Sequence, residues 1–277
     1  MNISRRTVLA GAGASVVLAN AAAHAIDLQP TDAVQDPKNL GRLYDVVREN
    51  GQNSQVNWAS SGLIFFKPDT GILVPLMRFH TSQWAVNRKG ADGRSQHLME
   101  ELLYFADLQS GEIVDRWTNV QTGETRDVEH QKIRGMPMVI TDVGAIEQPI
   151  WAQSFDGAIG PVRIQGGQLW MDENWSARTH AQPSASEPKT IHTLSTFIAS
   201  ASAAEARLRR ETDFLDVTYS NNTDTPLEAW MGYAEDTPGR LIWTVQGHKM
   251  QDAKRVPAKL AQRINADHRG WLDGPQL

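Results

Sequence analysis

The chain contains no cysteine among its 277 residues. It therefore cannot form disulfide bonds, hold an iron–sulfur cluster through thiolates, or use a cysteine nucleophile. An excess of basic side chains is also missing, because 27 Lys and Arg stand against 32 Asp and Glu, giving a formal net charge of -5. Such a chain has little with which to neutralise a phosphate backbone, so we expect no nucleic-acid partner.

Short catalytic and cofactor signatures are missing as well. The sequence has no Gly-x-Ser-x-Gly nucleophile motif, no phosphate-binding loop and no His-Glu-x-x-His zinc motif. We therefore expect neither a cofactor nor a resident metal. A metal site assembled across separate strands stays open, from His80, His97, His130, His180, His192 and His248.

No apolar run is long enough to predict a transmembrane helix. At the N-terminus, Ser4-Arg5-Arg6 precedes an uncharged run rich in Ala, Gly and Val, and Ala23-His24-Ala25 offers small residues where signal peptidase cleaves. This pattern predicts a twin-arginine signal peptide over residues 1–25 and a periplasmic location; a Sec signal with two chance arginines is the alternative. Residues 26–277 are then expected to form a single β-rich domain.

What is present is a succession of short strands. Alternating apolar and polar residues recur from residue 55 onward, and turn residues such as Gly166-Gly167 separate the segments. No alternation of strands with long helices occurs, so we predict a mainly β, antiparallel fold. So many meandering strands favour a barrel-like architecture, lipocalin-like or a strongly curled sheet, with a few short helices and a central cavity.

The densest mixture of aromatic, carboxylate and imidazole side chains lies at residues 96–130. We expect three strands here, joined by turns at Gly111 and Gly123. Both faces of the first strand are mostly apolar and each carries one carboxylate, so this strand should be covered on both sides. At least one glutamate then lies in apolar surroundings, which raises the pKa of its carboxyl. The alternative is an ion pair with Arg116.

A regular meander would bring side chains of its three strands together. Glu101, Trp117, Asn119 and His130 are then expected to line one patch, because neighbouring strands are about 5 Å apart. Whether that patch faces a cavity or a packed core depends on the register, which the sequence leaves open.

Two blocks of residues carry a family resemblance. The first runs from Glu101 through Tyr104, Trp117 and Asn119 to His130, and the second consists of Trp230, Pro238-Gly239-Arg240-Leu241, Gly247 and Lys249. Together they resemble the bacterial domain-of-unknown-function family 1838, over about residues 36–272. The chain departs from the family pattern at Val120 and Arg116. The resemblance implies an exported protein and brings no established reaction with it.

The remaining residues favour acid–base chemistry without a cofactor. As an enzyme, the protein would use Glu101 or His130 as the base, and Lys249, Arg240 or Arg116 to stabilise an oxyanion. Tyr104, Trp117, Asn119 and Trp230 would hold a small apolar or aromatic molecule, giving a lyase, isomerase or hydrolase. The alternative is a periplasmic small-molecule binding protein with no catalysis. A structural protein of the cell envelope is a third class, and it predicts a filled interior.

Overall fold

The fold was determined as a computed structural model. It describes residues 32–275 except 52, 91–93, 136, 150–151, 180–188 and 235. The expected signal peptide at 1–25 and the histidine at 180 lie outside the described residues. No helix of the described part is long and apolar enough to cross a membrane.

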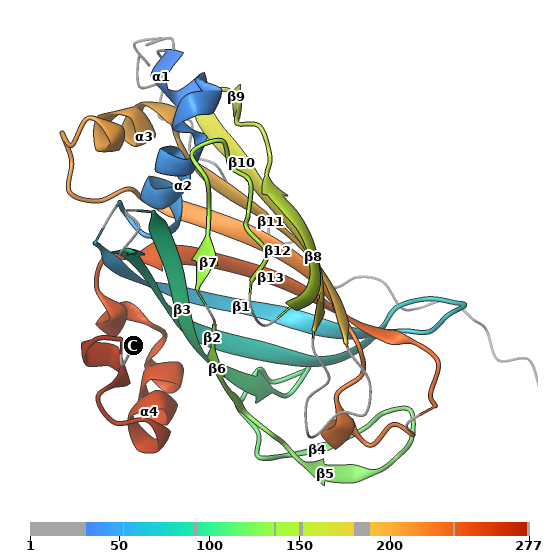
Figure 1. The fold of residues 1–277 in the computed structure, drawn as a ribbon. Coiled ribbons are helices and arrows are strands. Elements are labelled where there is room, and N and C mark those ends of the chain that lie inside the picture. Colours follow the sequence, from blue (N-terminus) through green and yellow to red (C-terminus); the bar gives the residue numbers. More distant parts are fainter. Residues whose placement is uncertain are drawn as a thin grey trace, which may run out of the picture.

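The described chain is built on one curled antiparallel sheet, which forms a half-barrel (Figure 1). Its strands follow one another in the order β6-β3-β2-β1-β13-β12-β11-β10-β8, with β7 paired to β3 and β9 paired to β10. The sequence-based expectation of a mainly antiparallel β fold with a strongly curled sheet is confirmed. The strands are β1 (Gln55–Lys67), β2 (Val74–Lys89), β3 (Ser95–Ala106), β6 (Gln131–Arg134), β7 (Met138–Val139), β8 (Ala152–Ile159), β9 (Arg163–Gln165), β10 (Gln168–Thr179), β11 (Thr190–Ser200), β12 (Val217–Thr225) and β13 (Arg240–Met250).

The turn between β9 and β10 follows the sequence closely. Gly166 and Gly167 have φ values of 57° and 74°, which a two-residue hairpin turn requires and which glycine adopts without steric cost. The predicted hairpin at this position is therefore confirmed.

Residues 107–130 do not continue the main sheet, so the expectation of a three-strand meander over residues 96–130 is wrong. The short strands β4 (Arg116–Thr118) and β5 (Thr125–Asp127) pair only with each other, and the next neighbour of β3 is β6. All three residues of β5 are exposed, and only Trp117 of β4 is buried. Because Trp117 is the only buried residue of β4 and β5, pairing this hairpin with a long strand of the main sheet would bury little apolar surface.

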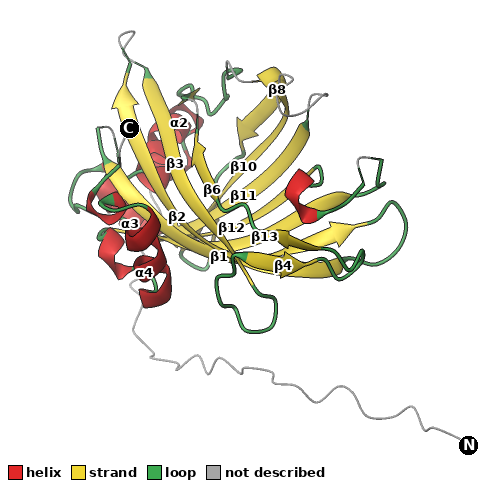
Figure 2. Ribbon diagram, turned by 90° about the horizontal axis from the view of Figure 1, so that it is seen from below, coloured by secondary structure: helices red, strands yellow, loops and turns green. Residues whose placement is uncertain are grey.

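The helical segments are α1 (Asp32–Gln35), η1 (Pro37–Asn39), α2 (Leu40–Arg48), α3 (Ala201–Leu208), η2 (Ala229–Met231), η3 (Ala253–Arg255), α4 (Ala258–Asp267) and η4 (Trp271–Asp273). The helices α1, α2 and α3 lie at one end of the half-barrel, α4 lies on its outside, and η2 lies at the opposite end beside the β4–β5 hairpin (Figures 1 and 2). Asp36 caps η1: its side chain accepts a hydrogen bond from the Lys38 amide, as its position before Pro37 predicts. Ser200, the last residue of β11, caps α3 by accepting a hydrogen bond from the Ala203 amide.

The buried apolar residues of the described chain form three clusters, two on one face of the sheet and one on the other. We call the face of β3 that carries Met99, Glu101 and Leu103 the inner face. One cluster, with Trp58 and Phe197, packs under α2 on that face, and a second, with Phe105 and Trp230, packs at the opposite end. The third cluster joins the outer face to α4 through residues such as Leu102 and Ile264. The inner face is thus filled at both ends.

Candidate ligand cavity

Between the two apolar clusters of the inner face lies a cavity of about 410 Å³. This volume is within the range of small-molecule sites, which is roughly 300–1,000 Å³. Its walls combine aromatic and aliphatic side chains with a band of polar ones. The main lining residues are Arg48, Phe79, Gln83, Met99, Glu101, Leu103, Glu173, Trp175, Thr193, Ser195, Phe197, Tyr219, Asn221, Glu228 and Trp243.

The polar band arises because inward-facing residues of adjacent strands become polar at the same level. Register pairs Glu101 with Gln83 between β3 and β2, and Thr81 with Ser60 between β2 and β1. On the other side, Asn221 of β12 faces Ser195 of β11 and donates to its Oγ over 2.9 Å. Apolar residues flank these positions along each strand, so the band crosses the sheet between the two filled ends.

Glu101 is a titratable group of the cavity. It is partly buried and lines the cavity directly. Burial raises the pKa of its carboxyl to about 7, against smaller opposing effects from a hydrogen bond with Thr81 and from the charge of Arg48. The sequence-based expectation that a glutamate of this strand lies in apolar surroundings agrees with that environment. The carboxyl is close to half-ionised at neutral pH.

A chain of hydroxyl groups leads from Glu101 across the sheet. Ser60 Oγ and Thr81 Oγ1 are 2.6 Å apart, and the Tyr219 hydroxyl bonds to Ser60. Burial first, and the charge of Glu101 second, raise the pKa of Tyr219 to about 12, so this phenol keeps its proton. Gly247 makes the approach possible, because a Cβ there would lie 2.3 Å from the Tyr219 ring.

Arg48, the last residue of α2, is the cation of the cavity. Its guanidinium lies 5.7 Å from the centroid of the Trp58 ring and 5.8 Å from that of Phe197, and Nη1 donates to Gln83 Oε1 over 3.2 Å. Stacking on two aromatic faces holds the charged group while keeping its edge open to the cavity.

Two further carboxylates line the same space. Glu173 accepts hydrogen bonds from the Tyr44 hydroxyl over 2.6 Å and from Trp175 Nε1 over 3.1 Å. Glu228 lies at the other end, and burial raises the pKa of its carboxyl. The cavity therefore has one guanidinium and three carboxyl groups, two of which are protonated more readily than in water.

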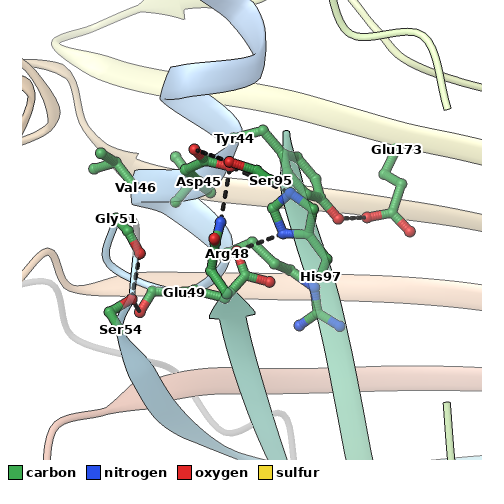
Figure 3. A network of polar contacts seen from close by, with 12 residues as sticks. Tyr44, Asp45, Val46, Arg48, Glu49, Gly51, Ser54, Ser95, His97 and Glu173 are labelled. Atoms are coloured by element: carbon green, nitrogen blue, oxygen red, sulfur yellow. Dashed lines mark hydrogen bonds and ion pairs between the residues drawn. The ribbon is translucent and has the colours of Figure 1, made fainter. Parts of the chain in front are cut away.

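A buried ion cluster fixes α2, and with it Arg48 and Tyr44, against the sheet (Figure 3). His97 of β3 lies between Asp45 of α2 and Glu49, the residue that follows the helix, with Nδ1 2.9 Å from Glu49 and Nε2 3.2 Å from Asp45. Burial alone would lower the pKa of His97, but the two carboxylates outweigh it and raise the pKa to about 9. Asn87 adds a hydrogen bond of 3.0 Å to Asp45.

The structure places the expected site residues in several different locations. Of the nine, Glu101 lines the cavity. Lys249 faces inward beside Trp58 but lies beneath α2, where it donates to the carbonyl oxygens of Val46 and Val47 over 3.0 and 3.1 Å. Arg240 binds the Asp224 carboxylate and the Thr190 carbonyl, so it ties three strands together.

His130 does not share a patch with Glu101. Its Nδ1 accepts a hydrogen bond from the Phe105 amide over 3.2 Å, and its Nε2 lies 3.5 Å from Asp115. Burial, followed by the charge of Arg263, lowers the pKa of His130. The imidazole is thus held at the far edge of β3.

The remaining expected residues are in the hairpin or the packed clusters. Trp117 and Trp230 pack edge-to-face in the second apolar cluster, and Tyr104 packs on the outer face in the cluster with α4. Asn119 is fully buried and donates to the Met231 carbonyl over 2.9 Å, which fastens the β4–β5 hairpin to η2. Arg116 is 71% exposed and lies near Asp127 of its own hairpin, so it does not pair with a β3 glutamate.

Sequence reasoning missed most of the polar residues that the cavity contains. Arg48, Gln83, Glu173 and Tyr219 come from four different elements. One signal was available in β11, where Thr193 and Ser195 interrupt an inward phase that is otherwise apolar. Polar residues at inward positions of the other strands, such as Ser60, Thr81 and Asn221, mark the same polar band across the sheet.

The described residues contain no group of three or more His, Asp or Glu that could hold a metal ion. No protein-family model matches the chain, and no curated protein matches it. A comparison with solved structures pairs it with the crystal structure of MucB in complex with MucA(peri), at 10% identity over 84% of this chain and 97% of that chain, with a TM-score of 0.13. A TM-score of 0.13 carries no argument about fold or function.

Proposed function

We propose that the inner-face cavity binds a small apolar or aromatic molecule and that Glu101 transfers a proton to or from it. The observation that carries this proposal is a carboxyl with a pKa of about 7 that opens into a cavity walled by Phe79, Trp175 and Trp243. A general acid or base is most effective when its pKa lies near the working pH. The proposed chemistry needs no cofactor, as in a lyase, isomerase or hydrolase.

The surroundings of Glu101 suit this role. Aromatic walls exclude water from a bound molecule, and the hydroxyls of Thr81, Ser60 and Tyr219 form a hydrogen-bonded chain beside the carboxyl. That chain supplies a donor for negative charge that develops on a substrate, since the Tyr219 phenol stays protonated. His130, Lys249 and Arg240 have no part in this proposal because each is bound elsewhere in the fold.

The Kemp elimination of 5-nitrobenzisoxazole tests the acid–base role directly. A base removes the proton at C3 while the N–O bond breaks, giving a cyanophenolate without nucleophile or cofactor. We expect kcat/KM to rise with pH through about 7, as Glu101 ionises. Glu101→Gln should lower it roughly 100-fold or more, the usual contribution of a positioned base.

The matched control is Glu100→Gln, which changes the neighbouring glutamate on the outer face of β3, where it pairs with Arg134. Thermal melting of each variant checks that it is folded. Equal rates for the wild type and Glu101→Gln, or a rate that ignores pH between 5 and 9, would overturn the acid–base role. Binding of the probe without elimination would leave a small-molecule binding protein as the function.

We also propose that the protein acts in the periplasm as an exported member of the bacterial domain-of-unknown-function family 1838. The support is the Ser4-Arg5-Arg6 pattern with its following apolar run, and the two sequence blocks that resemble the family. Fractionation of cells expressing the full chain tests the route. The wild type should be found in the periplasm, and a double substitution of Arg5→Lys and Arg6→Lys should keep it in the cytoplasm. Unchanged export of the double variant would contradict the twin-arginine route.

A further inference from the structure

We infer that the cavity recognises a small carboxylic acid, whose carboxylate binds the free edge of the Arg48 guanidinium while its apolar body lies against the aromatic walls. This inference rests on the proposed function, because it assumes that the inner-face cavity is a ligand site. It adds the class of ligand and the orientation in which the ligand is held.

The first support is the unused hydrogen-bonding capacity of Arg48. A guanidinium has five N–H donors in a planar fork, and Arg48 uses one of them, toward Gln83. No carboxylate of the described residues lies within 4.0 Å of it. Arg48 is partly exposed where it lines the cavity, so its remaining donors are available to an acceptor on a ligand.

The second support is that the neighbouring carboxylates are bound to other groups. Glu49, which follows Arg48 in the chain, lies 2.9 Å from His97. Glu173 accepts from Tyr44 and Trp175 through both of its oxygens. Gln83, which faces Glu101 in the strand register, accepts the hydrogen bond from Arg48 Nη1 through its Oε1. The protein thus keeps a cation and three carboxyl groups in one cavity without forming an ion pair at Arg48.

The third support concerns the charge and shape of the ligand. A planar carboxylate matches the guanidinium fork through two parallel hydrogen bonds. A doubly charged phosphate would meet Glu101, Glu173 and Glu228 in the same space, so a single negative charge fits the cavity better. From Arg48 the cavity leads toward Phe79 and Trp243, whose ring centroids are 5.3 Å apart, and these rings suit an aromatic or aliphatic body.

Isothermal titration with 2-naphthoate and 2-naphthamide tests the inference at pH 7, since the two probes differ in charge and are nearly equal in shape. We expect the wild type to bind 2-naphthoate more tightly than 2-naphthamide. Arg48→Gln should weaken 2-naphthoate roughly 10- to 100-fold, the usual effect of losing hydrogen bonds to a charged group, and change 2-naphthamide by less than about threefold. Arg48→Lys keeps the positive charge but lacks the planar fork of donors, so its affinity for 2-naphthoate should lie between those of the wild type and Arg48→Gln.

Lys38→Gln is the control, because it removes one exposed positive charge just before the same helix. It should leave the affinity for both probes unchanged. Retained 2-naphthamide binding shows that the Arg48 variants are folded with the cavity intact. Equal binding of both probes by the wild type, an equal loss of both in Arg48→Gln, or tighter binding of 2-naphthyl phosphate than of 2-naphthoate would overturn the carboxylate assignment. Failure of both probes to bind the wild type would instead count against the proposed ligand cavity itself.

Discussion

At the scale of single residues, the burial of the Glu101 carboxyl opposes stability. This carboxyl lies in surroundings that raise its pKa from 4.5 to about 7, chiefly through burial. The folded protein therefore binds the Glu101 proton more tightly than the unfolded chain does. Between pH 4.5 and 7 this group makes folding less favourable as the pH rises, and above pH 7 the full cost remains.

Glu101→Gln is accordingly expected to stabilise the protein at pH 8. The gain in the free energy of unfolding should be roughly 1–3 kcal/mol, from 1.36 kcal/mol per pKa unit reduced for solvent in the cavity. At pH 4 the variant and the wild type should be nearly equally stable, because the wild-type carboxyl is then mostly protonated in both states. Urea unfolding at the two pH values measures the difference, and a variant less stable than the wild type at pH 8 would contradict the assigned environment.

At the scale of elements, the sequence predicts strands better than their partners. Alternation identifies β3 and its two apolar faces, and Gly166-Gly167 identifies a hairpin turn, because both signals are local. The partner of a strand is decided by long-range packing. Residues 107–130 carry turn signals like those of a meander, yet Trp117 and Asn119 bind η2, more than a hundred residues away, and the hairpin leaves the sheet.

The same limit explains the candidate site. Glu101 was accessible to sequence reasoning because the apolar residues on both faces of its own strand predict that the strand is covered on both sides. Arg48 was not, since nothing near it in the chain shows that the end of α2 opens into the half-barrel. That placement results from the contact of His97 with Asp45 and Glu49, which joins β3 to α2 across about fifty residues.

At the scale of the whole molecule, the buried ion cluster of His97, Asp45 and Glu49 links α2, at one end of the half-barrel, to the sheet (Figure 1). The imidazolium and both carboxylates are buried, with side-chain exposures of 4%, 7% and 1% for His97, Asp45 and Glu49. Removing the positive charge leaves two buried carboxylates without their cation, which is strongly unfavourable. Global stability should therefore depend on the protonation of this one side chain.

The pKa of His97 is raised from 6.5 to about 9, so its stabilising contribution is complete below pH 6.5 and is lost as the pH rises through 9. Lys249 acts in the opposite sense above pH 7, because burial lowers its pKa to about 7.

Comparison with a variant separates the effect of His97 from that of Lys249. We expect the stability difference between the wild type and His97→Gln to shrink by roughly 2–3 kcal/mol between pH 6 and pH 10. His192→Gln, at an exposed position of β11, should show no such change. Guanidinium unfolding across this range measures both differences, and a constant difference for His97→Gln would show that the cluster is not held by a protonated imidazole.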